Sequence, residues 1–193
     1  MGKGQGTTGV SAVMTPDPEV LHVDHSLVEA AGRMRDLDVG LMFVVDGDQL
    51  VGAVTDRDIC CRGVADGVDA AETPVQHAMT RHIVFCRADV DIDAALEIME
   101  REDIRRLAVL NADDELVGVV SLGDLARAHP QPEAPGEALE EISSPTGTEK
   151  TPHAGLPAGG RAVTARKGVP ATYRERPRLP RRARVRGSVA NGG

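Results

Sequence analysis

The sequence predicts an α/β (α+β) fold, in which two β-α-β-β-α repeats pack with approximate two-fold symmetry and a disordered C-terminal tail follows. Three observations predict it. Sequence motifs recur at a nearly constant offset, which indicates an internal repeat. Within each copy, short apolar runs alternate with segments of helical periodicity, as expected for alternating strands and helices. From about His129 the chain becomes rich in Pro, Gly, Ser and Glu without apolar periodicity, which is typical of disorder.

The repeat is visible in three pairs of segments. "VMT" at 13–15 returns as "AMT" at 78–80, and "AAGRM" at 30–34 returns as "ALEIM" at 95–99. "VGLMFVVDGDQLVGAVTDRDI" at 39–59 lies over "IRRLAVLNADDELVGVVSLGDL" at 104–125, where one extra turn residue lengthens the offset from 65 to 66 (39 to 104, then 55 to 121). The predicted organisation is a flexible N-terminus (1–9), a first repeat (10–67), a second repeat (68–128) and the tail (129–193).

The first copy begins with a short strand, "VLHV" at 20–23. Ser26 and Glu29 then form a capping box. The helix that they open carries apolar residues at helical spacing (Leu27, Ala30, Ala31, Met34 and Leu37). "LMFVV" and "LVGAV", joined by the turn "DGD", predict a hairpin of buried strands, and Thr55 caps a last helix that runs into "RDICCRGVA".

The second copy repeats this order. We expect a strand at "IVF" (83–85), a helix at "DAALEIMERE" (93–102), a hairpin from "LAVL" and "ELVGVV", and a last helix that begins after Ser121. Neither copy is long enough to build a generous core alone, so the two sheets are expected to pack together.

Charge divides the chain into two regions. Residues 1–130 hold 11 Lys/Arg and 24 Asp/Glu, a net charge of −13, whereas residues 131–193 hold 11 basic and 6 acidic residues, a net charge of +5. An acidic ordered part argues against a nucleic-acid-binding core, because phosphate binding needs a clustered basic face. For the basic run at 166–187 two interpretations stay open: a solvated tail, or an arm for nucleic acid or another anionic surface.

The predicted compartment is the cytoplasm. No apolar run approaches the roughly 18 residues of a membrane span, and "MGKGQG" has no apolar signal core. Cys60, Cys61 and Cys86 form no CxxC pair or disulfide framework, which favours a reducing environment. Buried structural thiols are the preferred interpretation of these cysteines, with redox sensing as the alternative.

The two copies share a motif that has two interpretations. "GAVTDRD" at 52–58 and "GVVSLGD" at 118–124 place a hydroxyl residue three positions before an aspartate. This spacing forms a capping box, so the motif could serve the helix start alone. The same first turn also offers a carboxylate for ribose hydroxyls and unpaired N–H groups for phosphate, so the motif could bind a nucleotide.

The ordered set of motifs resembles a tandem pair of CBS domains (a Bateman module) over residues 10–128. "VTDRDICCRGVADGVD" and "IRRLAVLNADDELVGVVSLGDLARAHP" look especially like small stand-alone actinobacterial CBS-pair proteins, some of which belong to hypoxic or stress responses. The resemblance implies a ligand-sensing module for an adenosine-containing molecule such as AMP, ADP, ATP, SAM or NAD, with no obligatory cofactor. It also implies a homodimer. The family often has proline before the second strand, where Phe43 and Ala108 stand here, which bears on the shape of the base pocket.

The resemblance also implies two unequal clefts. The main site would combine Thr15, Val20, Val39, Gly40, Arg105, Arg106, Val119, Ser121 and Asp124, and the second site would combine Thr55, Arg57, Asp58, Ile83 and Ile104. Arg105 and Arg106 stand where the family carries phosphate-binding basic residues, and a guanidinium suits phosphate through its planar donor fork. The alternative is that both are surface arginines that balance neighbouring acidic residues.

Other functions are less well supported. "DVDIDAALEIME" at 89–100 imitates a calcium loop, but it has Ala94 where that loop needs glycine. The histidines lack metal-ligand spacing at i,i+4, and no catalytic triad order or P-loop is present. We therefore expect no metal site and no enzyme. The leading hypothesis is a non-catalytic regulatory module whose dimer or partner surface changes with an adenosine nucleotide. The alternative is a structural or stress-response interaction protein with weak or no ligand, and an unknown protein partner is left open.

Overall fold

The computed structural model describes residues 8–131, 133–143 and 178–180. The first repeat forms a three-stranded sheet of β2 (Val20–His22), β3 (Leu41–Asp46) and β4 (Gln49–Thr55) in the order β2-β3-β4. β2 runs parallel to β3, and β3 and β4 form the expected antiparallel hairpin, with an irregularity between Val44 and Val45. Gly47 in the turn has φ +61°, a conformation that glycine adopts without strain.

Two helices cover this sheet on one side. α1 (Leu27–Leu37) begins with the predicted capping box, because Ser26 accepts the backbone N–H of Glu29 and the Glu29 carboxylate accepts the N–H of Ser26. Of the five residues in its predicted apolar stripe, α1 buries Leu27, Ala30 and Met34, whereas Ala31 and Leu37 are exposed. α2 (Asp56–Ile59) starts at Thr55 and continues into a single π-helical turn, η2 (Cys60–Val64).

The second repeat has the same order of elements: β5 (Phe85–Arg87), α3 (Ile92–Glu102), β6 (Arg106–Leu110), β7 (Leu116–Ser121) and α4 (Leu122–Ala128). One predicted strand was misplaced: the strand is Phe85–Arg87, not 83–85, because Phe85 is the residue opposite Ala108 in the parallel pair with β6. The calcium-like segment is a helix start, where the Asp91 side chain accepts the N–H of Ala94.

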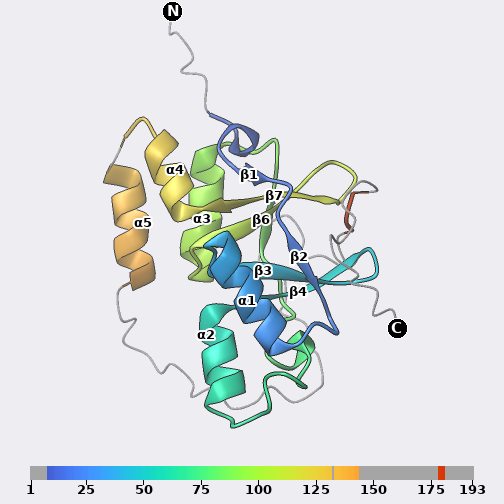
Figure 1. Cartoon of the computed structure of the whole chain (residues 1–193). Coiled ribbons are helices and arrows are strands. Elements are labelled where there is room, and N and C mark those ends of the chain that lie inside the picture. The colour runs from blue at the N-terminus through green and yellow to red at the C-terminus, as the bar shows by residue number, and fades with distance from the viewer. Residues whose placement is uncertain (1–7, 132, 144–177, 181–193) are drawn as a thin grey trace, which may run out of the picture.

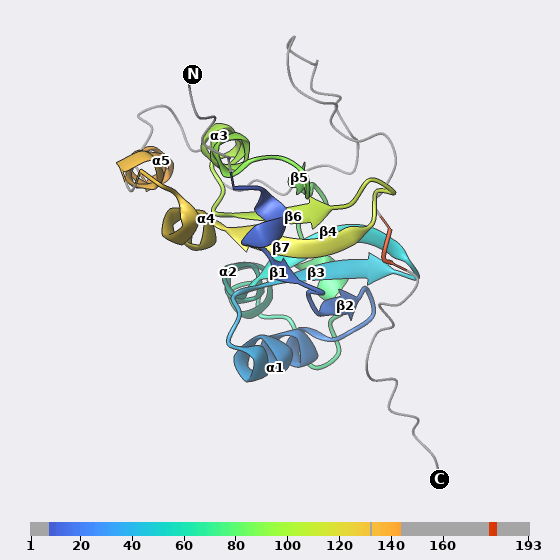
Figure 2. The ribbon, with the colours of Figure 1, turned by 90° about the horizontal axis from the view of Figure 1, so that it is seen from above.

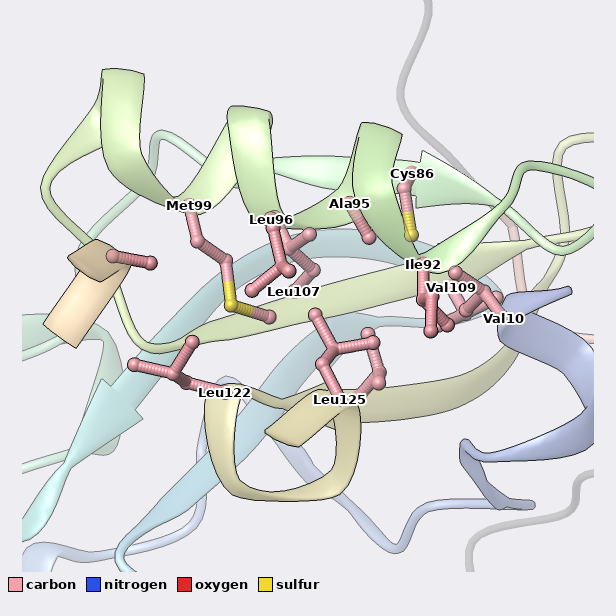
Figure 3. Packing of buried hydrophobic residues seen from close by; sticks show 12 residues of the cluster. Val10, Cys86, Ile92, Ala95, Leu96, Met99, Leu107, Val109, Leu122 and Leu125 are labelled. Atoms are coloured by element: carbon pink, nitrogen blue, oxygen red, sulfur yellow. The ribbon is translucent and has the colours of Figure 1, made fainter. Parts of the chain in front are cut away.

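The opening segment of each repeat pairs with a strand of the other repeat. β1 (Thr15–Pro16) pairs with β7 of the second repeat, and Thr80 pairs with Ala53 of the first repeat. The turns that precede them, η1 (Val10–Ala12) and η3 (Val75–His77), also pack into the other copy's core, where Val10 and Val75 are fully buried. Figure 1 shows the blue N-terminal segment reaching the β6–β7 layer, and Figure 3 shows Val10 among side chains of the second repeat.

A third apolar cluster joins the repeats, and we call it the inter-repeat core. It consists of Val20, Phe43, Val45, Leu50, Ala108, Leu110, Leu116 and Leu179, with further residues packed around it. Seen from above, the two sheets lie one over the other with α1 and α2 on one outer side and α3, α4 and α5 on the other (Figure 2). Phe43 and Ala108 lie within β3 and β6 and are 3% and 1% exposed, so they fill this core instead of preceding a strand.

The expected disorder after residue 128 is wrong for a helix and for the short segment Arg178–Pro180. Helix α5 (Glu133–Ser143) packs against α3 and α4, and Ala138 is fully buried in the core of the second repeat. A spacing of four residues, which places Ala134, Ala138 and Ile142 on one helix face, is the signal in the sequence for this helix. His129, which ends α4, bonds through Nε2 to the carboxylate of Asp93 on α3 at 2.7 Å. The rest of the predicted tail, apart from Arg178–Pro180, lies outside the described residues, as do residues 1–7 of the predicted flexible N-terminus.

Thr8 and Gly9, the last two residues of that N-terminus, are bonded to the second repeat. The Thr8 carbonyl accepts the N–H of Ile92, and Gly9 bridges to Asp91. Among the described helices, none is both long and apolar enough to cross a bilayer.

Candidate functional site

Asp124 is held at the junction where β7 ends and α4 begins. Its Oδ2 atom accepts the backbone N–H of Ser121 at 2.8 Å and the Ser121 hydroxyl at 2.6 Å, and the Asp124 N–H donates to Ser121 Oγ at 3.2 Å. This is the capping box that the sequence predicted. The Asp124 side chain is 19% exposed, so its carboxylate remains open to solvent.

The first copy contains the same arrangement. Asp58 Oδ2 accepts the N–H of Thr55 at 3.0 Å and its hydroxyl at 2.7 Å, and the Asp58 N–H donates to Thr55 Oγ1 at 3.1 Å. The Asp58 side chain is 18% exposed. In both copies the capping hydrogen bonds occupy Oδ2 of the aspartate. The two positions therefore differ in the partners of the other carboxylate oxygen, Oδ1.

The Oδ1 atoms have different arginine partners. Asp124 Oδ1 lies 2.5 Å from a guanidinium nitrogen of Arg127, whose side chain is 76% exposed. Asp58 Oδ1 lies 3.4 Å from Arg62, and the same guanidinium also donates to the Ala78 carbonyl at 2.6 Å. Arg62 is therefore fixed between Asp58 and the segment that crosses from the second repeat. Among the described residues, Arg127 makes only a surface ion pair, which contributes little to stability.

Arg62 and Arg127 were missed as site residues by the sequence analysis. The signal was present, because an arginine three or four residues after an aspartate on a helix reaches that carboxylate. The copies differ here since the position equivalent to Arg62, at an offset of 66, is Ala128.

Arg105 and Arg106 lie at the start of β6, beside the second copy's motif. Arg106 stands opposite Ser121 in the β6–β7 pair, and the Arg105 carbonyl accepts the N–H of Leu122. Both side chains are exposed, and the Arg105 guanidinium donates to the hydroxyl of Ser143 at the end of α5 at 2.8 Å. The structure therefore places Arg106 opposite Ser121, which is bonded to Asp124, and the binding role of these three residues stays a prediction.

Three further predicted residues of the main site lie along the sheets. Thr15 is exposed and stands opposite Val119 of β7. Val119 is partly buried against the inter-repeat core, and Val20, at 7% exposed, belongs to that core. Thr15 and Val119 are thus adjacent, and Val20 and Val119 share one apolar cluster.

Val39 and Gly40 line a pocket of about 410 Å³ in the first repeat. The Gly40 carbonyl accepts the N–H of Asp56, and a Cβ atom on Gly40 would lie 3.2 Å from the Asp56 carboxylate. The pocket lies between α1 and the start of α2, and its lining consists of Ala31, Met34, Arg35, Asp38, Val39, Gly40, Asp56 and Ile59. These two residues therefore belong to a pocket whose other lining residues were not predicted.

The remaining residues of the predicted second site are distributed over two clusters. Ile83 packs against the inter-repeat core, and Ile104 packs against the core of the second repeat. Arg57 is exposed on the first turn of α2, where its N–H donates to the Asp56 carboxylate at 2.7 Å. Thr55 and Asp58 are the members that the structure brings into direct contact.

The three cysteines lie in two environments, two at the surface and one in the core. Cys60 and Cys61 are exposed, and Cys86 is buried in β5, where desolvation raises the pKa of its thiol to about 12. A thiol with so high a pKa is an unreactive core residue, whereas Cys60 and Cys61 are exposed, contrary to the preferred prediction of buried thiols. Within the described residues, no three His, Cys, Asp or Glu side chains gather closely enough to hold a metal ion.

Comparison with known proteins agrees with this architecture. The family model for the CBS domain matches residues 10–62 and 75–130. The chain is 37% identical over 138 residues to the uncharacterized protein YlbB of Bacillus subtilis, a match that covers 70% of this chain and 92% of YlbB. It is 35% identical over 107 residues to hypoxic response protein 1 of Mycobacterium tuberculosis, covering 55% of this chain and 74% of that protein.

Two solved structures extend the comparison. The crystal structure of Hypoxic Response Protein I with two coordinated zinc ions has a TM-score of 0.57 at 31% identity and covers 64% of this chain and 100% of the other. The crystal structure of CBSX2 in complex with AMP has a TM-score of 0.54 at 25% identity and covers 62% of this chain and 94% of CBSX2. The two family matches fall on the two structural repeats and together cover more than half of the sequence, so the chain belongs to the CBS domain family as a tandem pair.

Proposed function

We propose that this protein is a non-catalytic regulatory module that binds an adenosine-containing nucleotide beside Asp124, in a cleft between its two repeats. Binding would change the surface offered to a second copy or to a protein partner. A ligand shifts such an equilibrium only through different affinities for the two states. CBSX2, a relative of the same fold, was crystallised with AMP, which supports the adenosine class.

One observation carries this proposal: a partly exposed carboxylate stands at the end of β7 with an arginine in strand register beside it. Oδ2 of Asp124 is saturated by Ser121, but Oδ1 is paired only with the highly exposed Arg127 among its described contacts. Arg127 can turn away and leave Oδ1 to a ribose hydroxyl, since an ionised carboxylate accepts several hydrogen bonds. The position of Arg106 opposite Ser121 supports a contact between its guanidinium and an anionic group of the same ligand.

The first copy supports a weaker site. Asp58 is held by Arg62, which also donates to the Ala78 carbonyl, so freeing Asp58 Oδ1 would disturb a contact between the repeats. Arg106 has Leu41 at the equivalent position, at an offset of 65, so the first copy lacks this cation. We therefore retain the main site around Asp124 and the second site around Asp58 as unequal sites.

The test is calorimetric titration of the full chain with AMP, ADP, ATP, SAM and NADH. Asp124→Asn and Asp58→Asn form a matched pair, because each removes the same capping carboxylate from the same type of helix start. We expect Asp124→Asn to weaken binding at least about tenfold, the loss that corresponds to about 1.4 kcal/mol, and Asp58→Asn to leave the tighter site unchanged. Equal losses, or a loss in Asp58→Asn alone, would contradict the assignment.

The proposal of an interaction protein without a strong ligand remains the second candidate, and exposed apolar side chains favour it. Leu37 at the end of α1 is 42% exposed, and Val39 just beyond α1 is 41% exposed. We propose that a second copy of this chain covers this surface. Light scattering coupled to size exclusion should then give a dimer that Leu37→Glu shifts towards monomer. A chain that is monomeric at high concentration would contradict the dimer, and no heat with any of the five ligands would favour the interaction protein.

A further inference from the structure

We propose that Arg178–Pro180 is a docking motif through which the protein's own C-terminal tail ties its two repeats together. The segment lies beside the turns of both hairpins, β3–β4 and β6–β7, in the two views of the molecule (Figures 1 and 2). It is far from α5 in sequence and contacts neither the capping motifs nor their arginines in any described hydrogen bond. The motif shares the inter-repeat core with Val20 and Val119, but no described hydrogen bond joins it to Asp124 or Asp58.

The backbone of the motif bonds to both hairpins in turn. The Arg178 N–H donates to the Asp114 carbonyl at 2.9 Å, and the Arg178 carbonyl accepts the Leu116 N–H at 2.8 Å. The next N–H, that of Leu179, donates to the Asp48 carbonyl at 2.7 Å. Because successive peptide groups of an extended chain point to opposite sides, a single extended segment can hold two neighbouring strands or turns.

The residues that receive the motif are equivalent in the two repeats. Asp48 and Asp114 are 66 positions apart, as are Gln49 and Glu115, and Arg178 makes bridges with both members of the second pair. The bridge is antiparallel to Gln49 and parallel to Glu115. The two flanking segments therefore run in opposite directions, so a single extended segment between them is antiparallel to one and parallel to the other.

Side-chain burial adds to the backbone contacts. Leu179 is 8% exposed and belongs to the inter-repeat core with Leu50 and Leu116, one from each repeat. Pro177 and Pro180 flank the pair Arg178-Leu179 in the sequence, and proline has no N–H. The stretch "PRLP" therefore offers two backbone donors, and both are used.

The charges of the two turns and of the C-terminal tail also favour the tail as the segment that binds here. The two turn regions carry five acidic residues (Asp46, Asp48, Asp113, Asp114 and Glu115), while six further arginines stand between positions 174 and 186 of the tail. Long-range attraction between them is screened over about 8 Å at physiological ionic strength. Docking of the motif should therefore weaken as salt is added, which a purely apolar contact would not do.

The tail of the same chain can reach this surface. The 34 residues at 144–177 between α5 and Arg178 can span at most about 120 Å when extended, whereas a domain of this size is roughly 40 Å across. No second copy is needed, and we assign the motif to its own chain.

The experiment compares Leu179→Asp with Leu156→Asp in the full chain. Both variants add one negative charge to the tail, but only the first alters the docked side chain. We expect Leu179→Asp to lower the melting temperature by roughly 4 °C or more and Leu156→Asp to leave it unchanged. The amide of Leu116, which donates to Arg178, should exchange its hydrogen at least about tenfold faster in Leu179→Asp, while the amides of α1 keep their rates.

Two further readouts keep the proposal open to refutation. A synthetic peptide of residues 174–184 should restore the melting temperature of Leu179→Asp, and the same peptide with Asp at 179 should not. Unchanged melting and unchanged Leu116 exchange in Leu179→Asp would overturn the motif. If Leu179→Asp instead converted a dimer to monomer, the tail of a second copy would be the occupant, and the assignment to one chain would be overturned.

Discussion

Gly52 and Gly118 begin the two copies of the shared motif. We expect that replacing either with alanine, which adds the smallest side chain, lowers the stability of the protein more than the same change at other glycines. A Cβ atom on Gly52 would lie 2.8 Å from the backbone oxygen of Thr80 and 2.7 Å from the sulfur of Met79, and one on Gly118 would lie 3.1 Å from the oxygen of Thr15. The methionines can rotate away, but the two carbonyls belong to the segments that cross between the repeats. The contact at Gly52 is the closer one to a backbone atom, so Gly52→Ala should be the more damaging change.

The size of the expected loss in unfolding free energy follows from the contacts that an added Cβ atom would displace. Overpacking of a tight site costs about 1–3 kcal/mol. Moving the crossing segment would also weaken the two Ala53–Thr80 hydrogen bonds, of 2.9 and 2.8 Å, each of which contributes about 0.5–1.5 kcal/mol. We expect Gly52→Ala to lower the free energy of unfolding by about 3 kcal/mol and the melting temperature by roughly 6–12 °C. Gly118→Ala should cost about 1–2 kcal/mol.

The assay is urea and thermal unfolding followed by circular dichroism, because the chain has no tryptophan and one tyrosine. Gly32→Ala is the matched control: its Cβ would meet nothing within 4 Å, and it lies inside α1. That change should raise stability by about 0.5–1 kcal/mol through the helix preference of alanine. If Gly52→Ala were as stable as the parent protein, the close approach of the crossing segment would not be what the motif glycine serves.

Two other predictions concern titration and reactivity. A thiol reagent at pH 8 should label Cys60 and Cys61 in the native protein and Cys86 only in urea, because burial raises the pKa of the Cys86 thiol to about 12; native labelling of all three would contradict the burial of β5. The hydrogen bond to Asp93 raises the pKa of His129 above its ordinary 6.5. This stabilisation is complete below pH 6.5 and is lost as the pH rises through the raised value. Melting temperatures of the parent protein and Asp93→Asn should therefore differ more at pH 5.5 than at pH 8.5, and an equal difference at both would show that the ion pair is unimportant.

Local features of the fold could be predicted because they are recorded in adjacent residues. The capping boxes at Ser26, Thr55 and Ser121 all form with the predicted partners. Each depends on a spacing of three residues and on nothing further away in the chain. The hairpins followed from the same kind of evidence, an apolar run on either side of a short polar turn. The contacts of Arg62 and Arg127 with the motif aspartates were just as local, and a search for i,i+3 and i,i+4 ion pairs would have found them.

Features that depend on which distant segment a strand or helix packs against could not be predicted from adjacent residues. "VMT" and "AMT" were recognised as equivalent, but equivalence does not say which sheet each segment joins. The strand at Phe85–Arg87 was placed two residues too early because "IVF" is the more apolar run, whereas the register is set by pairing with β6. Helix α5 was not predicted because the residues on its apolar face are mostly alanines. The burial of Ala138 depends on the packing of α5 against α3 and α4, which the sequence of α5 alone does not show.

The exchange of opening segments explains why the repeat occurs as a pair. The core of the first repeat contains Val75, Ala78 and Met79 from the opening segment of the second repeat, and the core of the second contains Val10, with Val13 and Met14 packed on it. A single repeat expressed alone would lack these residues and would expose its motif glycine to solvent. We therefore expect the two repeats to unfold together as one cooperative unit. A ligand bound at either aspartate would consequently stabilise both repeats, which is the physical requirement for a site in one half of the molecule to control the surface of the other.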